Sequence, residues 1–424
     1  MRPTWLQLFA VTLIFKSNFA WAQSLNEVLI DVEKNNPEIE AAKSILSQTY
    51  DEIPTAWTNF LPNISLSSSI DRSVTDDNYD LSSTKADAFT NTLSLSQNLF
   101  NLQNNEQFRK ATLNIAKQEQ TFRSVTQATF LNVITAYLAV IKTQNVVALK
   151  TKNVEVLQSH YDNTKVQHEM RRMTNADLAQ AESRLAQGKA DELSSKIDYN
   201  SAVSTYQRLV GKTPHNLTLP AFENDFTKDI LDIEKMAIAE HPDVLAAEIN
   251  IKRARSDIES KKRAFGPSLA LSGSLTKTDT NNKTSANTGT TVSTLGLTFT
   301  MPLYQKGIER KELATAEKAL IQAEAEYETA KRLAIDNTRK AWESMQGAAS
   351  KIVAYRAQEK AATIALESIR LELKAGRRTV LNLLDSEKEL LNARVNLASA
   401  EHDLILTKYE LQERVGRMHT VLEK

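Results

Sequence analysis

The sequence predicts a mainly α-helical fold that also carries β-strands of the membrane-barrel type, built from one structural unit used twice. Three observations predict it. The 424 residues contain only 10 Gly and 9 Pro, and no Pro occurs in residues 63–213 or after residue 302. Long uninterrupted elements are therefore expected. The two halves of the chain repeat each other, and each half contains a pair of segments in which apolar and polar residues alternate.

Residues 1–22 have the pattern of a secretory signal peptide. Arg2 provides a positive start, residues 5–15 are mostly apolar, and residues 20–22 (Ala-Trp-Ala) supply small side chains at the key positions of a cleavage site. The mature chain would then begin at Gln23. A membrane anchor or a buried N-terminal helix is the alternative, although the apolar run is shorter than the ~20 residues that span a bilayer.

Two copies of a unit of about 205 residues make up the mature chain. Pro37, Pro62 and Gly211 of the first copy match Pro242, Pro267 and Gly416 of the second. The first copy spans residues 23–213, a linker spans residues 214–228, and the second copy spans residues 229–424. Each copy is expected to begin with a short helix that stops before its first proline, because the residue preceding proline is pushed out of the α region. A second helix follows, to about residue 60 or 264.

Each copy contains two segments with the alternation of membrane β-strands. They lie at about residues 62–72 and 88–100 in the first copy, and at 267–277 and 292–303 in the second. One face of such strands meets lipid and the other meets water. The residues expected to face lipid include Leu66, Leu95, Leu271 and Leu297. No segment after the signal peptide offers 18 consecutive apolar residues, so passage through a membrane is expected to use these strands. A half-buried soluble hairpin would show the same alternation.

A long helical hairpin is predicted to follow the strands in each copy, over residues 101–211 and 305–418. Residues 101–172 contain neither Gly nor Pro, and one helix of that length would be ~100 Å long. The last segment keeps a seven-residue repeat of large side chains at Leu383, Leu390, Leu397, Leu404 and Leu411, with small residues between them. This pattern is typical of coiled coils, in which neighbouring helices supply the stabilising contacts.

The composition argues against an enzyme, a cofactor or metal site, and nucleic-acid binding. Cysteine is absent, and the six histidines lack the spacing of a metal site. Lys and Arg together number 52, as do Asp and Glu, so no basic excess favours nucleic acid. Gly211-Lys212-Thr213 is similar to the end of a phosphate-binding loop, but Tyr206 occupies the place of the required earlier glycine. Gly211 is therefore interpreted as a helix C-terminal residue.

Four strands per chain are too few to close a membrane barrel, for which eight is the smallest common number. Several chains must contribute, and twelve strands from three chains would enclose a water-filled lumen. The chain resembles the outer membrane efflux protein family, also called the TolC family. The resemblance rests on the duplication, on residues 36–38 (Asn-Pro-Glu) and 60–63 (Phe-Leu-Pro-Asn), and on residues 376–385 (Gly-Arg-Arg-Thr-Val-Leu-Asn-Leu-Leu-Asp), which are similar to the family's turn at the closed periplasmic end.

The resemblance implies a homotrimer whose twelve strands form one transmembrane β-barrel in the outer membrane and whose coiled-coil helices form a tunnel across the periplasm. Such a channel would be the passive exit duct of a tripartite efflux pump or a type I secretion system. Its partners would be a periplasmic adaptor protein, an inner membrane transporter and outer membrane lipid. A soluble periplasmic coiled-coil adaptor or a structural helical protein is the alternative.

The resemblance also implies a gate at the periplasmic entrance. Arg378 matches the family's latch arginine, and Asp385 matches the deeper of two acids at the entrance. The shallower acid is replaced by Asn382, and Asp177 takes the corresponding place in the first copy. Glu169, near the matching turn of the first copy, is a candidate acceptor for Arg378, a pairing that the sequence does not fix. Ordinary solvated charges at helix ends would give the same sequence pattern.

Overall fold

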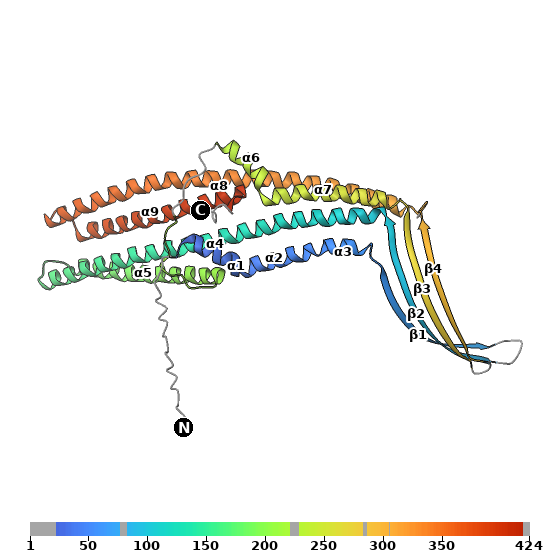
Figure 1. Ribbon diagram of the computed structural model, residues 1–424. Helices are drawn as coiled ribbons and strands as arrows, with labels where there is room; N and C mark the ends of the chain where they lie inside the picture. Colours follow the sequence, from blue (N-terminus) through green and yellow to red (C-terminus); the bar gives the residue numbers. More distant parts are fainter. Residues whose placement is uncertain (1–22, 77–82, 221–228, 283–285, 305, 419–424) are drawn as a thin grey trace, which may run out of the picture.

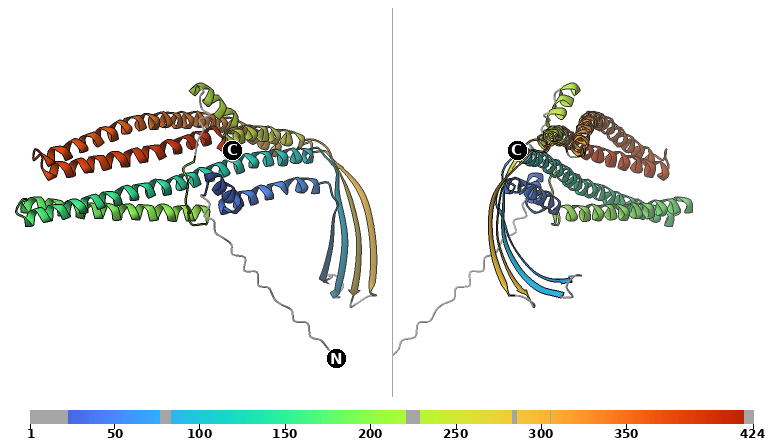
Figure 2. Two further views of the ribbon diagram at one scale, coloured as in Figure 1. Left: turned by 60° about the vertical axis from the view of Figure 1, so that its left-hand side comes forward. Right: turned by 90° about the vertical axis from the view of Figure 1, so that its right-hand side faces the viewer.

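The protein is elongated in the computed structural model, with four strands at one end and the turns of two helical hairpins at the other (Figure 1). The structure describes residues 23–76, 83–220, 229–282, 286–304 and 306–418. The predicted signal peptide lies outside this set. Figure 2 shows that the strands curve together as one sheet and that both hairpins extend in the same direction away from it.

Each copy has the same order of elements. In the first, α1 (Leu25–Asn35), α2 (Pro37–Tyr50) and α3 (Glu52–Thr58) precede β1 (Asn63–Asp76), β2 (Ser83–Asn101), α4 (Leu102–Glu169) and α5 (Asn175–Val210). In the second, α6 (Ile230–Glu240) and α7 (Pro242–Arg263) precede β3 (Ser268–Asn282), β4 (Thr288–Thr300), α8 (Ile308–Lys374) and α9 (Val380–Val415). The predicted fold class, with its long helical hairpins and four strands, is confirmed.

The second helix of the first copy is interrupted, whereas the sequence analysis predicted one helix to about residue 60. α2 ends at Tyr50 and α3 begins at Glu52. Pro54 lies in the first turn of α3, where its missing N–H is harmless, but in a continuous helix its ring would clash with the carbonyl of Tyr50. The second copy has Glu259 at the matching position, and α7 runs unbroken through it.

The four strands form one antiparallel sheet in the order β1-β2-β3-β4, so β2 and β3 join the two copies. Within the described chain, β1 and β4 each have one neighbouring strand. The strands continue beyond the predicted apolar segments. β2, predicted over residues 88–100, begins at Ser83. Backbone pairing does not require apolar side chains, which explains why the ladder continues into the polar residues.

The predicted seven-residue repeat contributes to the packed seam of the second hairpin, and α5 has a matching seam in the first hairpin. The buried members of these seams are Leu383, Leu390, Leu411, Ala393 and Ala400 in α9, and Leu185, Tyr206, Ala181, Gly188 and Ser195 in α5. A Cβ at Gly188 would lie 2.6 Å from Leu157 Cδ1 of α4. Small residues at the seam therefore let the two helix backbones approach closely.

A compact core surrounds the middle of α4, where α1, α5 and α9 pack against it. Phe130, Tyr137 and Tyr206 are fully buried there. The Tyr137 hydroxyl lies 2.8 Å from the Gln23 carbonyl oxygen and accepts a hydrogen bond from the Thr218 N–H at 3.0 Å. Among the described residues, α4 is the one helix long and apolar enough to cross a membrane, with a mean hydropathy of 1.5 over 18 residues, and 56% of that stretch is buried. Its apolar residues are therefore accounted for by this core.

Candidate tunnel entrance and membrane-facing sheet

The two hairpin turns lie at the same end of the molecule, farthest from the sheet (Figure 1). Each following helix begins with a capping box, made by Thr174 and Asp177 in α5 and by Thr379 and Asn382 in α9. Hydrogen bonds from the Thr174 side chain and backbone lower the pKa of Asp177. Asp177 and Asn382, both predicted to lie at the entrance, therefore hold equivalent positions, and both stabilise helix N-termini.

Arg378 forms an ion pair within its own hairpin. Its Nε donates to Glu372 Oε2 at 2.7 Å, across the turn between α8 and α9. Within the single chain the guanidinium thus pairs with Glu372, and the pairing of Arg378 with Glu169 stays a prediction. Glu169 is the last residue of α4 and is exposed.

Asp385 joins the two hairpins. Its Oδ1 accepts a hydrogen bond from Arg184 Nη2 of α5 at 2.7 Å. Next to it, Leu384 of α9 is 2% exposed and packs with Leu157 and Leu185 of the first hairpin. The contact between the hairpins thus has an apolar centre with an ion pair beside it.

A second ionic contact, which the sequence analysis missed, lies on the other side of the same helix. Glu387 is buried, and it accepts a hydrogen bond from Arg370 of α8 at 2.5 Å and lies 3.8 Å from His160 of α4. Burial opposes ionisation of this carboxyl, but the interactions with His160 and Arg370 outweigh it and lower the pKa of Glu387. An acid four residues after the seam residue Leu383 was the available sequence signal.

The strand pairing places the four leucines predicted to face lipid on one face of the sheet. These are Leu66, Leu95, Leu271 and Leu297. Leu66 pairs with Leu93, which pairs in turn with Leu275, and residues an even number of positions apart share a face. Leu66 is 72% exposed and Leu297 is 62% exposed, so this chain leaves both uncovered.

The opposite face of the sheet is polar. One of its rows runs across all four strands through Ser65, Ser94, Ser274 and Thr294. Hydroxyl groups of neighbouring strands also lie close together on this face. The Oγ1 atoms of Thr90 and Thr278 are 3.3 Å apart. A sheet with one apolar and one hydroxyl-rich face has the surface chemistry of a barrel wall between lipid and water.

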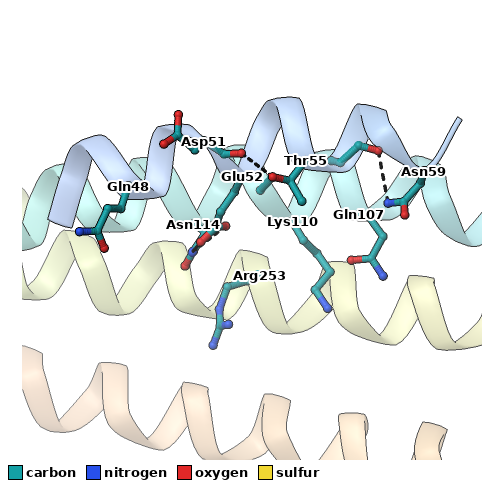
Figure 3. A pocket seen from close by; sticks show the side chains of 11 residues that line it. Gln48, Asp51, Glu52, Thr55, Asn59, Gln107, Lys110, Asn114 and Arg253 are labelled. Atoms are coloured by element: carbon teal, nitrogen blue, oxygen red, sulfur yellow. Dashed lines mark hydrogen bonds between the residues drawn. The ribbon is translucent and has the colours of Figure 1, made fainter. Parts of the chain in front are cut away.

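A polar cavity of about 380 Å³ lies where α3, α4 and α7 meet (Figure 3). Glu52 in this cavity accepts a hydrogen bond from Asn114 Nδ2 at 2.7 Å, and Lys110 Nζ donates to Asp257 at 2.5 Å. These contacts tie the three helices together. Among the described residues, no group of three or more metal-binding side chains is placed to hold an ion.

The family profile described as outer membrane efflux protein matches residues 28–212 and 234–417. The two matched segments correspond to the two copies. The chain belongs to the outer membrane efflux protein family. As a member of the TolC family, it is an outer membrane channel whose helices extend into the periplasm.

Individual relatives agree with this assignment. The outer membrane efflux protein BepC of Brucella suis is 25% identical over 401 residues, covering 94% of this chain and 86% of BepC. The alkaline protease secretion protein AprF of Pseudomonas aeruginosa is 23% identical over 336 residues, covering 78% of this chain and 70% of AprF. The crystal structure of the CmeC outer membrane channel of Campylobacter jejuni matches with a TM-score of 0.79 at 16% identity, covering 93% of this chain and 86% of CmeC. That structural likeness shows the shared fold.

Proposed function

We propose that three copies of this chain assemble into a closed passive duct that carries solutes or proteins across the outer membrane. The observation that carries this proposal is the open four-stranded sheet, in which β1 and β4 form the two edges. Open strand edges are unstable in lipid, because every backbone polar group there must be paired, whereas the exposed apolar face is unstable in water. Pairing β4 of one copy with β1 of the next satisfies both edges.

The helices support the same closure. α4 packs against α2 and α3 on one side and against α7 on the other, and α7 packs against α8. The helical layer therefore has one edge at α2 and α3 and the other at α8. In the chain, α3 directly precedes the edge strand β1, and α8 directly follows the edge strand β4. One seam between neighbouring copies would thus close the barrel and the tunnel together.

A passive duct does not drive transport by itself, so we expect partners that do. We propose a periplasmic adaptor protein and an inner membrane transporter, which together deliver cargo to the hairpin turns. BepC is named as an efflux protein and AprF as a protease secretion protein, at similar identities to this chain. Both drug efflux and type I protein secretion are therefore consistent with the proposed duct.

Reconstitution of the purified protein in planar lipid bilayers tests the proposed function. We expect discrete conductance steps from a species that native mass measurement in mild detergent identifies as a trimer. A stable monomer with full β-content, or a protein released with the soluble periplasmic fraction, would contradict the proposal. The phenotype of a gene deletion then distinguishes the two kinds of cargo. Loss of efflux raises antibiotic sensitivity, whereas loss of secretion removes a protein from the medium.

A further inference from the structure

The two hairpin turns concentrate positive charge at the end of the molecule farthest from the sheet. We define the arginine collar as Arg171, Arg172, Arg377 and Arg378, all of which are exposed. Residues 170–174 and 375–379, which form the turns, contain these four arginines and no acidic residue. The collar therefore gives both turns the same sign of charge.

The charge balance of this end differs from that of the whole chain, in which 52 basic residues equal 52 acidic ones. Residues 165–177 contain three Lys or Arg and two Asp or Glu, and residues 370–382 contain four and one. The total is seven basic against three acidic residues, a net charge of +4 per chain. Arg370, which is counted in this total, pairs with Glu387 just outside the second segment, so the net charge of this end with that pair removed is +3 per chain; Asp385 is paired with Arg184.

Arg171 occupies a backbone position that favours glycine. Its φ is +57°, in the left-handed region, and the matching residue of the second turn is Gly376 with a φ of +73°. Both turns close in the same way: the Arg171 N–H donates to the His168 carbonyl at 2.8 Å, and the Gly376 N–H donates to the Leu373 carbonyl at 2.9 Å. Gly376 shows that this turn accepts glycine at the position of Arg171. The first copy nevertheless has an arginine there, although a side chain in the left-handed region is strained.

Two of the three acids in these segments make local contacts, and the third, Glu169, is an exposed carboxylate at the end of α4. Asp177 caps α5 through Thr174, and Glu372 pairs with Arg378. At the position that matches Asp177, the second copy has the neutral Asn382. Three collar arginines, namely Arg171, Arg172 and Arg377, are left to set the field in front of the turns.

We infer that the arginine collar makes the periplasmic mouth of the duct selective for anions, and that its preferred cargo carries net negative charge. This inference rests on the proposed trimeric duct, in which three copies bring twelve collar arginines around one axis. Charges of one sign that line an opening raise the local concentration of the opposite ion and its rate of entry. A unit charge at about 10 Å in water changes the occupancy of a permeating ion roughly twofold, and several such charges multiply.

Reversal potentials in planar bilayers test this selectivity. With a tenfold KCl gradient at low ionic strength, we expect the wild-type channel to pass chloride in preference to potassium. The variant Arg171→Gly removes three charges per trimer and relieves the left-handed strain, so the turn keeps its shape. We expect it to reduce the ratio of anion to cation permeability at least roughly twofold, and Arg171→Gly with Arg377→Gln to reduce it further.

Lys235→Gln provides the matched control, because it also removes three charges per trimer but lies on α6, far from the turns, with a side chain 76% exposed. It should leave the reversal potential unchanged. In the wild type, the preference should shrink at ~1 M salt, where the Debye length is about 3 Å. A preference for cations in the wild type, or the same ratio of anion to cation permeability in the Arg171 variant and the wild type, would contradict the proposed role of the collar. The proposed duct would still stand. Failure to form any conductance would overturn the duct and the collar with it.

Discussion

Arg184 and Asp385 link the two hairpins of one chain, with Nη2 and Oδ1 2.7 Å apart although the residues are separated by 201 positions in the sequence. The pair connects α5 of the first copy with α9 of the second. Arg378, which the sequence analysis assigned to the latch, pairs with Glu372 inside the second hairpin instead. The contact between Arg184 and Asp385 must therefore break if the hairpins separate at this level, together with the packing of Leu384.

Loss of the Arg184 contact should loosen the closed entrance. An exposed ion pair is worth only ~0 to 1 kcal/mol, but three symmetry-related copies add, which is enough to shift a closed state. We expect Arg184→Ser to raise single-channel conductance more than Arg378→Ser does, with little change in trimer stability. The exchange Arg184→Asp with Asp385→Arg should return the conductance toward the wild-type value. A wild-type conductance in the Arg184→Ser variant would remove the pair of Arg184 and Asp385 from the gate.

The apolar face of the sheet gives a second prediction. Leu66→Arg or Leu297→Arg should cost about 2 to 4 kcal/mol if these side chains lie near the bilayer midplane, and should reduce insertion into the outer membrane. Ser67→Arg and Thr298→Arg are the matched controls, since adjacent residues of a strand point to opposite faces. The amount of protein in the outer membrane fraction measures the effect. Similar losses in both sets would show that neither face meets lipid.

The duplication supplies an internal control for the end of α9. Gly416 has a φ of +87°, and a Cβ there would lie 2.6 Å from the Glu240 carbonyl oxygen. Gly211, the matching residue after α5, has a φ of +79° with nothing within 4 Å. We expect Gly211→Ala to cost about 1 kcal/mol, from backbone strain alone, and Gly416→Ala about 1 to 3 kcal/mol more, from overlap with backbone atoms. Urea unfolding followed by circular dichroism compares them, and equal midpoints would contradict the overlap.

His402 gives the protein a pH-dependent stability. Its side chain is 5% exposed, and its Nε2 lies 3.2 Å from Asn145 Nδ2 of α4. Burial and the nearby Lys142 lower the pKa of His402, against the opposing effect of Asp403 and Glu401. His402 therefore binds a proton more readily in the unfolded chain than in the folded one, and its contribution to the free energy of unfolding falls as the pH falls below about 6.5.

The variant His402→Gln should show a smaller loss of stability between pH 7.5 and pH 5.5, because glutamine keeps a hydrogen-bonding side chain but does not titrate. Urea midpoints at the two pH values measure the difference. A variant that loses as much stability as the wild type over this range would assign the pH dependence to other groups.

The parts of the fold that depend on neighbouring residues or on a periodic pattern could be predicted from the sequence. The seven-residue repeat ending at Leu411 predicted the buried seam, and alternation predicted the common face of Leu66 and Leu297. The ion pairs at the entrance could not be predicted in the same way. Whether Asp385 meets Arg184 depends on how one hairpin is rotated against the other, and that rotation depends on packing between the hairpins, as around Leu384, rather than on a local or periodic pattern.

The central claim, closure of the barrel by edge pairing between copies, can be tested by cross-linking, because the chain contains no cysteine. Ser94 of β2 pairs with Ser274 of β3. Ser65 pairs with Ser94 in the first copy and Ala270 with Thr298 in the second, so β1 matches β3 at an offset of 205 residues and β2 matches β4 at an offset of 204. Ser94 and Ser274 therefore correspond to Thr298 of β4 and Ser69 of β1, and the duplication predicts that Thr298 of one copy lies opposite Ser69 of the next. Directly opposite residues in an antiparallel pair have Cβ atoms about 4.5 to 5.5 Å apart, within reach of a disulfide after small shifts.

The measurement is oxidative cross-linking in the outer membrane of Thr298→Cys combined in turn with cysteine at Ser67, Ser69 and Asp71, which share one face of β1. We predict a covalent trimer, strongest for the Ser69 combination. Each single variant and the combination of Thr298→Cys with Ser68→Cys, on the opposite face, should give none. If every combination on the shared face gave only monomers, the edges β1 and β4 would not meet between copies, and the proposed barrel would be contradicted.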